Sequence, residues 1–197
     1  MTEKDDISLF DLDGTLCDYD SAIRRDYDKI KSPNDSPYIP FFNNNNQPEH
    51  IKNRIRMIRN QIGWWENLEE FKLGFDVLNI ARDLNFTLHI LTKGPYSSTN
   101  AWTEKVKWVR KHILDGKITI TEDKSLVYGK VLVDDFPEYI QNWLIWRPRG
   151  LVIMPAHEWN GEYIHPNVIR YDGSNLEQVR LAMNAAKERA SLERLIL

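Results

Sequence analysis

A short apolar run near the start of the chain leads directly into two aspartates that flank a single residue. The run predicts a buried strand that ends at Asp11. Ligands of open α/β sheets bind beyond the carboxyl ends of the strands, so both aspartates are expected at a ligand site, although an ordinary Asp-Gly turn is the alternative. Two carboxylates this close repel each other unless a cation or a proton lies between them. The stretch reads Ile7-Ser8-Leu9-Phe10-Asp11-Leu12-Asp13-Gly14-Thr15.

The composition excludes several classes of protein. The chain has 197 residues, enough for one core with room for an inserted subdomain. A net charge of −3 gives no general attraction to nucleic acid or to an anionic membrane. The single cysteine, Cys17, excludes an internal disulfide framework and is expected to be a small packed residue. The N-terminal segment is too acidic for a signal peptide, and no apolar run approaches the roughly 20 residues of a membrane span, so we expect a soluble, cytoplasmic protein.

Strand-like apolar runs alternate with helical patterns along most of the chain. This alternation predicts an α/β fold with a doubly wound, mostly parallel sheet. Residues 18–77 hold no strong strand, so they are expected to form a small helical cap inserted after the first strand. The core would then comprise residues 1–17 and 78–197. Further strands are predicted at 86–91, 118–120, 131–133, 150–154 and 168–171.

The predicted cap contains an apolar stripe, a basic face and an aromatic pair. The stripe is expected to face the interior of the cap, and the basic face is interpreted as solvated, with anion steering or a nucleic-acid contact as alternatives. Trp64 and Trp65 follow the helix. Phe41 and Phe42, in a proline- and asparagine-rich connection, are candidates to cover a site. The stripe is Ile51, Ile55, Ile58 and Ile62, and the basic residues are Lys52, Arg54, Arg56 and Arg59.

Polar side chains follow three of the predicted strands. Because the carboxyl ends of parallel strands meet at one edge, these side chains are expected to lie close together. Lys124 precedes Asp134 by ten residues and can reach the same edge. Carboxylates suit Mg²⁺, whereas hydroxyl and ammonium groups suit phosphate oxygens, so the set predicts phosphoryl transfer. The residues are Asp11, Asp13, Thr92, Lys93, Asp134 and Asp135.

These motifs resemble those of the haloacid dehalogenase-like (HAD) phosphatases. The segment 11–15 is similar to their first motif, Thr92 to the second, Lys124 to the third and Asp134-Asp135 to the fourth. A closer resemblance, over roughly residues 7–136, is to the 5′(3′)-deoxyribonucleotidases, which carry a helical cap between the first two motifs. It rests on Trp64-Trp65-Glu66-Asn67-Leu68-Glu69, Glu104-Lys105-Val106-Lys107-Trp108-Val109 and Thr121-Glu122-Asp123-Lys124-Ser125. The chain departs from that family at Lys93-Gly94-Pro95, where the family has Ser-Pro.

The resemblance implies a HAD-like Rossmannoid core and a role for each motif residue. Asp11 would be the nucleophile that forms an aspartyl-phosphate, and Asp13 the general acid and base. Mg²⁺ would be held by Asp11, by Asp13 through its backbone carbonyl, and by Asp134 and Asp135, with Asp135 in direct contact. Thr92 and Lys124 would bind phosphate, and Lys93, which departs from the family, is this chain's own further candidate for that role. Trp64 and Trp65 would either stack on a base or pack in the cap core.

Several readings of the function stay open at this point. The first is a phosphatase of nucleoside monophosphates, and the second applies the same chemistry to a sugar phosphate or another small phosphoester. The third is a nucleic-acid-binding or end-processing protein that uses the basic helix. The expected partner is a small phosphomonoester rather than a membrane or a nucleic acid, and a homodimer is left open. His157, Glu158 and His165 fit no common zinc signature and are not expected to bind a metal.

Overall fold

Six parallel strands form one sheet in the order β3-β2-β1-β4-β5-β6. The structure is a computed structural model, and it describes residues 6–35, 37 and 47–190. The chain starts in the middle of the sheet and returns to both sides of β1, which confirms the doubly wound α/β fold. The strands are β1 (Ile7–Phe10), β2 (Thr87–Thr92), β3 (Lys117–Ile120), β4 (Val131–Val133), β5 (Leu151–Pro155) and β6 (Val168–Tyr171).

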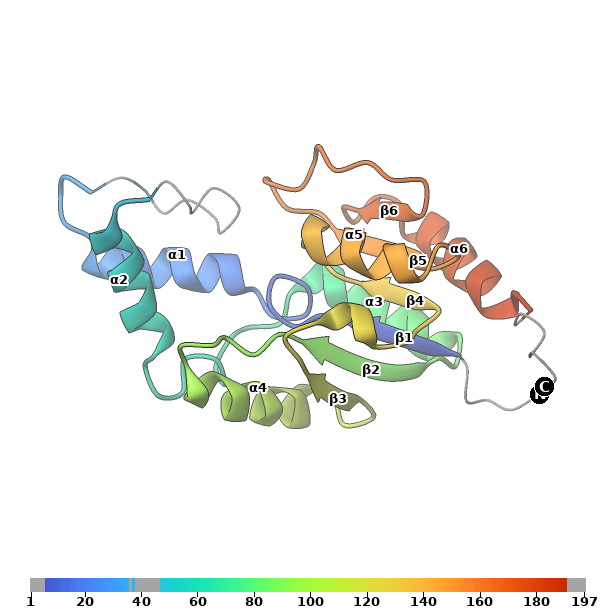
Figure 1. The fold of residues 1–197 in the computed structure, drawn as a ribbon, viewed down its shortest axis with the longest axis horizontal. Helices are drawn as coiled ribbons and strands as arrows, with labels where there is room; N and C mark the ends of the chain where they lie inside the picture. The colour runs from blue at the N-terminus through green and yellow to red at the C-terminus, as the bar shows by residue number, and fades with distance from the viewer. Residues whose placement is uncertain (1–5, 36, 38–46, 191–197) are drawn as a thin grey trace.

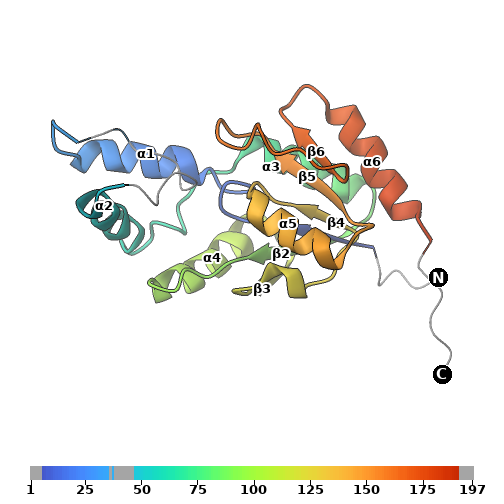
Figure 2. The ribbon, with the colours of Figure 1, turned by 45° about the horizontal axis from the view of Figure 1, so that its top comes forward.

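Helices cover both faces of this sheet. Adjacent residues of β1 point to opposite faces: Phe10 belongs to the apolar cluster of α3, α4 and α6, and Leu9 to a second cluster with α5. Figures 1 and 2 show α1 and α2 set apart, beyond one end of the sheet. The helices are α1 (Tyr19–Ile30), α2 (Glu49–Arg59), α3 (Lys72–Asp83), α4 (Thr99–His112), the short η3 (Lys124–Leu126), α5 (Pro137–Trp146) and α6 (Leu176–Glu188).

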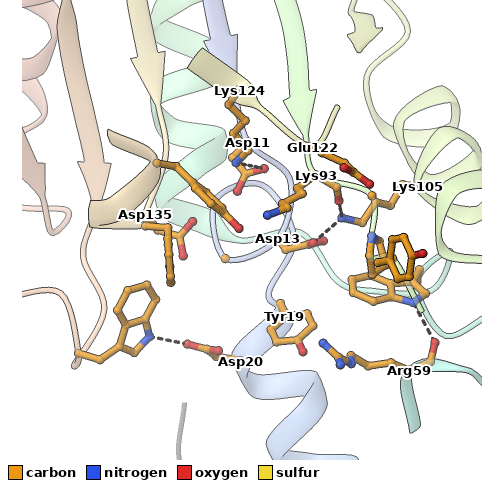
Figure 3. A pocket seen from close by; sticks show the side chains of 18 residues that line it. Asp11, Asp13, Tyr19, Asp20, Arg59, Lys93, Lys105, Glu122, Lys124 and Asp135 are labelled. Carbon is orange, nitrogen blue, oxygen red and sulfur yellow. Dashed lines mark hydrogen bonds and ion pairs between the residues drawn. The ribbon is translucent and has the colours of Figure 1, made fainter. Parts of the chain in front are cut away.

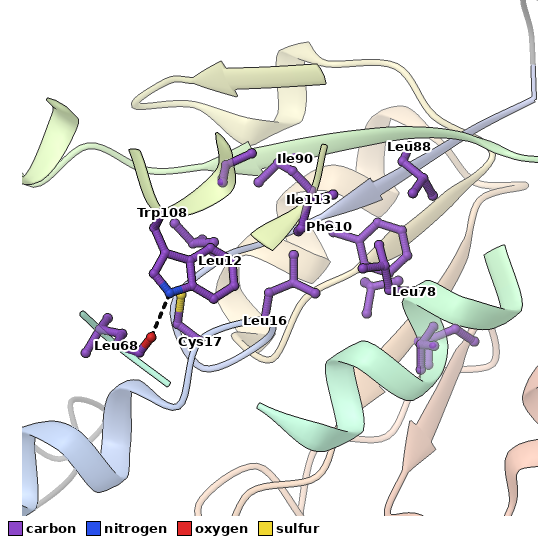
Figure 4. Close-up of a cluster of buried hydrophobic side chains, with 14 of the residues drawn as sticks. Phe10, Leu12, Leu16, Cys17, Leu68, Leu78, Leu88, Ile90, Trp108 and Ile113 are labelled. Atoms are coloured by element: carbon purple, nitrogen blue, oxygen red, sulfur yellow. Dashed lines mark hydrogen bonds between the residues drawn. The ribbon is translucent and has the colours of Figure 1, made fainter. Parts of the chain in front are cut away.

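A buried indole of α4 lies against the turn after β1 and is hydrogen-bonded to the segment that precedes α3. Trp108 is fully buried and donates a hydrogen bond from Nε1 to the Leu68 carbonyl at 2.7 Å. Figure 4 shows this ring beside Leu12 and Cys17, which follow β1. Cys17 is fully buried, as expected of a small packed residue. This packing fixes where the chain leaves the core for the cap.

The apolar stripe of the cap differs from the expectation at its last residue. Ile51, Ile55 and Ile58 are buried, but Ile62 is 90% exposed. Helix α2 ends at Arg59, so Ile62 lies in the following turn and the helical period no longer applies to it. Phe41 and Phe42 lie outside the described residues. None of the described helices is long and apolar enough to cross a membrane.

Helix α3 spans the predicted C-terminal boundary of the cap. A boundary between residues 77 and 78 would cut α3, which runs without a break from Lys72 to Asp83. The helix contacts β2, β5 and α6, which are all elements of the core. We therefore propose that the cap comprises residues 18–71 and that α3 belongs to the core.

Candidate active site

The turn after β1 brings the first motif against the end of β4. Gly14 has a φ of +77°, and a Cβ placed there would lie 2.3 Å from Asp135 Oδ2. Both the left-handed backbone and the close approach require glycine at this position. Thr15 donates a hydrogen bond from its hydroxyl to Asp135 Oδ1 at 2.8 Å. The motif Asp-x-Asp-Gly-Thr therefore serves to join two strand ends as well as to supply carboxylates.

Lys124 bridges two of the predicted carboxylates. Its Nζ lies 2.8 Å from Asp11 Oδ1 and 2.8 Å from Asp134 Oδ2, and 4.6 Å from the centroid of the Tyr139 ring. Burial of the side chain alone would lower the pKa of Lys124, but the carboxylates of Asp11 and Asp134 outweigh burial and raise it. Lys124 therefore stays protonated where it lines the cavity.

Asp11, Asp134 and Asp135 form a compact acidic cluster, with one oxygen of each lying within 4.8 Å of the others. Burial raises the pKa of Asp134 to about 6, and burial together with the charges of Asp134 and Asp11 raises the pKa of Asp135 well above its usual range. Three buried carboxylates beside the single ammonium of Lys124 therefore do not readily ionise together unless a further cation binds. Hard carboxylate oxygens in this arrangement fit a divalent cation such as Mg²⁺.

The two adjacent aspartates of the fourth motif have different surroundings. Asp134 is fully buried, and its carboxylate accepts hydrogen bonds from Lys124 and from the Phe136 backbone N–H at 2.9 Å. Asp135 lines the cavity. Of these two aspartates, Asp135 is therefore the one placed to contact a ligand in the cavity, whereas Asp134 holds Lys124.

A second buried lysine, which the sequence analysis did not single out, holds Asp13. Lys105 on α4 is 1% exposed, and its Nζ donates to Asp13 Oδ2 at 2.5 Å, to Thr92 Oγ1 at 3.1 Å and to the Lys93 carbonyl at 2.7 Å. Burial raises the pKa of Asp13 even though Lys105 opposes it. Asp13 therefore retains a proton to higher pH than an ordinary aspartate, as a general acid requires.

Thr92, the last residue of β2, and Lys93, the first residue after it, lie in different surroundings. Thr92 is fully buried, accepts a hydrogen bond from Lys105 and does not line the cavity. Lys93 does line the cavity, with its Nζ 5.3 Å from the centroid of the Tyr139 ring. A phosphate-binding role is thus better supported for Lys93 than for Thr92.

One cavity of about 580 Å³ joins these groups to the cap. Figure 3 shows the acidic residues and lysines of the strand ends on one side and residues of the cap on the other. The size of the cavity and its mixed polar and aromatic lining suit a small organic ligand. Its lining residues are Asp11, Asp13, Gly14, Tyr19, Asp20, Arg59, Trp65, Lys93, Gly94, Pro95, Tyr96, Lys105, Glu122, Lys124, Asp135, Phe136, Tyr139 and Trp159.

The two cap tryptophans lie in different positions. Trp64 is buried, donates from Nε1 to Asp26 at 3.0 Å and is absent from the cavity lining. Trp65 lines the cavity, but it is only 3% exposed. Its ring stacks on Tyr19 with centroids 5.7 Å apart, and Lys105 Nζ lies 4.9 Å from its centroid. Trp65 therefore offers little free ring surface in this conformation.

His157, a residue that the sequence analysis set aside, lies beside the acidic cluster. Its Nε2 is 2.6 Å from the Gly14 carbonyl and 3.8 Å from Asp135 Oδ2. The ring stacks between Phe71 and Trp159, with centroids 5.0 Å and 5.1 Å away. His157 follows the end of β5 by two residues, so the strand-end rule that identified Asp11 could also have found it. In the part of the chain that the structure describes, the acidic cluster is the only candidate metal group.

Comparison with known proteins identifies the family of the chain. The model of the family described as "5' nucleotidase, deoxy (Pyrimidine), cytosolic type C protein" matches residues 5–162. The human cytosolic-type 5′(3′)-deoxyribonucleotidase is 23% identical over 141 residues, which cover 64% of this chain and 69% of that protein. A solved HAD hydrolase of family IA, variant 3, from Entamoeba histolytica is 13% identical, with a TM-score of 0.52 over 93% of this chain and all of its own, and supports the fold. The family match spans well over half of the chain, which therefore belongs to the cytosolic type C 5′ nucleotidase family.

Proposed function

We propose that this member of the family is a Mg²⁺-dependent phosphatase of nucleoside monophosphates that acts through an aspartyl-phosphate on Asp11. Family membership makes the chain a phosphoric monoester hydrolase. The observation that carries the finer proposal is the position of Asp11, which lines the cavity, pairs with the Lys124 ammonium and lies in one cluster with the carboxylates of Asp134 and Asp135. A carboxylate held in this way is oriented for attack on a bound phosphoryl group.

In the first half of the reaction, an oxygen of Asp11 attacks phosphorus and the bond to the ester oxygen breaks. Asp13 donates its proton to that leaving oxygen, which its raised pKa favours. Lys124 and Lys93 stabilise the negative charge on the transferring oxygens, since both line the cavity next to Asp11. Removing one such contact typically costs on the order of 10²-fold in rate.

In the second half, the same Asp13 acts as a base. Its carboxylate takes a proton from water, the water oxygen attacks phosphorus, and the acyl-phosphate bond to Asp11 breaks, releasing inorganic phosphate. Lys105 holds Asp13 through the 2.5 Å contact, so that one side chain can serve both steps without moving far.

The acidic cluster is the proposed Mg²⁺ site. Asp11 and Asp135 would supply side-chain oxygens, with Asp13 contributing its backbone carbonyl and Asp134 supporting them. Mg²⁺ bound there would supply Lewis-acid stabilisation of the phosphoryl charge and allow the neighbouring carboxylates to ionise together.

A nucleoside monophosphate is the favoured substrate for two reasons. The human relative is named as a 5′(3′)-deoxyribonucleotidase. The cavity also continues from Asp11 to aromatic rings, among them Tyr19 and Tyr139, which suit a base. Of the two cap tryptophans, Trp64 does not line the cavity and Trp65 lines it with its ring covered by Tyr19, so we propose base stacking for neither in this conformation.

A nucleic-acid-binding function has less support. The basic face of α2 is partly neutralised, because Arg54 pairs with Asp35 and Arg56 pairs with Glu49 at 2.7 Å. A protein that bound nucleic acid through this face would instead leave its cations available to phosphates.

The proposal is tested by a phosphate-release screen with Mg²⁺ over 5′- and 3′-nucleotides, their deoxy forms, sugar phosphates and a generic aryl phosphate. We expect a nucleotide to have the highest kcat/KM and EDTA to abolish turnover. If a sugar phosphate gives the highest value, the hydrolase chemistry stands and the nucleotide assignment is wrong. If no nucleotide outperforms the aryl phosphate, the nucleotidase proposal is likewise wrong.

A further inference from the structure

Among the residues that the structure describes, four cations line the active-site cavity, and they differ in whether a carboxylate pairs with them. Lys124 pairs with Asp11 and Asp134, and Lys105 pairs with Asp13. Lys93 and Arg59 make no ion pair with any carboxylate of the described residues. Among the described residues, neither of these two positive charges in the cavity wall is in ion-pair contact with a carboxylate.

These two cations belong to opposite sides of the cavity. Lys93 follows β2, and Figure 3 shows it close to Asp11 and Asp13. Arg59 is the last residue of α2 in the cap, and the figure shows its guanidinium turned toward Tyr19 and well separated from the acidic cluster. Lys93 is thus placed for the reacting phosphate, whereas Arg59 lies near the part of the substrate that is remote from it.

The backbone around Arg59 keeps its side chain at this position. The Arg59 carbonyl accepts a hydrogen bond from Trp65 Nε1 at 2.9 Å, which joins the end of α2 to the cavity wall. The guanidinium lies against the Tyr19 hydroxyl, which is neutral and cannot balance its charge. Asp20 also lines this side, but its Oδ2 accepts from Trp159 Nε1 at 2.8 Å, away from Arg59.

An ordinary explanation for Arg59 is that a cation in the last turn of a helix stabilises the helix dipole. Arg56 occupies the same last turn and satisfies this role on the exposed surface, where it pairs with Glu49. Arg59 differs because it is half-buried, lines a cavity and forms no ion pair with a carboxylate of the residues that the structure describes. A guanidinium in such a place is suited to bind a phosphate with two parallel hydrogen bonds.

We propose that Arg59 forms a second phosphate subsite at the cap side of the cavity, so that the preferred substrate is a phosphomonoester that carries a second phosphate remote from the one that is hydrolysed. This inference rests on the proposed phosphatase function and narrows its substrate class. For a nucleotide substrate it favours a nucleoside bisphosphate over the monophosphate with the same base.

The test compares matched pairs of substrates that differ only in a second phosphate. The pairs are adenosine 5′-monophosphate with adenosine 3′,5′-bisphosphate, and fructose 6-phosphate with fructose 1,6-bisphosphate, assayed by initial phosphate release with Mg²⁺. A charge-assisted contact of this kind should raise kcat/KM for the bisphosphate of at least one pair by about 10-fold or more. Most of the gain should lie in KM, because the contact exists before and during the reaction.

Substitutions of Arg59 separate the charge from a merely structural role. In Arg59→Gln the ratio of kcat/KM between bisphosphate and monophosphate should fall to about one, and Arg59→Lys should restore part of it. Arg56→Gln is the matched control, since this residue shares the last turn of α2 but pairs with Glu49, and its ratio should equal that of the wild type.

The outcomes distinguish this subsite from the proposed function. If the wild type hydrolyses monophosphates but shows no preference for either bisphosphate, or if Arg59→Gln keeps the preference, the subsite is wrong and the phosphatase proposal stands. If no phosphomonoester is hydrolysed, the phosphatase proposal is wrong. Titration calorimetry then measures the affinity for both members of each pair and tests whether the second phosphate subsite exists. Equal affinity for both members of each pair would overturn it.

Discussion

Lys105 Nζ lies 2.5 Å from Asp13 Oδ2 and so ties helix α4 to the turn after β1. The neighbouring residue, Glu104, accepts backbone N–H groups of the cap at 2.8 Å from Gly63 and 3.1 Å from Trp65. Two consecutive side chains of α4 therefore hold the proposed general acid on one side and the cap loop on the other. We expect the position of the cap and the orientation of Asp13 to depend on each other.

Replacement of Lys105 by Met should impair catalysis more than substrate binding. The change removes the ammonium that donates to Asp13, and it leaves the Thr92 hydroxyl and the Lys93 carbonyl without this donor. We expect kcat to fall by roughly 10²-fold, as for loss of a general acid–base function, while KM changes less. Steady-state kinetics check this, with Lys107→Met as the control, because Lys107 is exposed and pairs with Glu66 outside the cavity. An unchanged kcat would contradict the role of Lys105.

Replacement of Glu104 by Gln should weaken the attachment of the cap. One of its two carboxylate acceptors becomes an amide N–H₂ group, so either Gly63 or Trp65 loses its partner. The loss of a hydrogen bond to a charged group should lower the free energy of unfolding by about 1.5–3 kcal/mol. Urea unfolding measures this effect, and a rise in KM would accompany it because Trp65 lines the cavity. The exposed Glu188→Gln serves as the control, and equal stability of the two variants would count against the proposed attachment.

Acid should selectively weaken the packing of Trp64 in the cap. Hydrogen bonds to Asp26, chiefly from Arg25 and also from Lys29 and Trp64, hold the pKa of Asp26 well below its usual range. A carboxyl whose pKa is lower in the folded state stabilises the fold fully above its unfolded pKa of about 4 and loses this effect as the pH falls through the folded pKa.

Asp26→Asn should therefore have a lower Tm than the wild type near neutral pH, and the difference should narrow as the pH falls below about 4. Thermal unfolding followed by circular dichroism over this range checks it. A difference that stays constant with pH would mean that the charge of Asp26 is not the cause.

Mg²⁺ should stabilise the folded chain even without substrate. Binding at the acidic cluster of Asp11, Asp134 and Asp135 favours the folded state by about 2.7 kcal/mol when the ion is present at 100 times its Kd. Thermal unfolding in MgCl₂ should thus show a higher Tm than in NaCl of equal ionic strength. Asp135→Asn should lose this increase. An equal increase in that variant would place the ion elsewhere.

The strand-end residues could be predicted from sequence because local patterns determine them. A buried strand followed by a polar residue identifies a sheet edge, and this rule found Asp11, Lys93 and Asp135 on the cavity wall. It also placed Thr92 at the right edge, but whether a strand-end side chain faces the cavity depends on the packing of α4. Lys105 lies between Thr92 and Asp13, and no strand pattern predicts that.

The residues that come from helices and loops were harder to predict. Arg59 belongs to a helix face that reads as solvated, yet the end of α2 turns this one cation into the cavity while Arg56 stays exposed. The same helix end explains why Ile62 is exposed, since the helical period that predicts its burial stops at Arg59. Such positions depend on where a helix ends and how the cap lies on the core, which are tertiary properties.

The most direct measurement concerns Asp11 itself. Wild-type protein and Asp11→Asn are mixed with a radiolabelled phosphomonoester and Mg²⁺, quenched rapidly in acid, and assayed for phosphate release and for label bound to protein. The aspartyl-phosphate mechanism predicts hydroxylamine-labile label on the peptide that contains Asp11 in the wild type, and neither label nor turnover in the variant. Near-normal phosphate release by Asp11→Asn would contradict the mechanism.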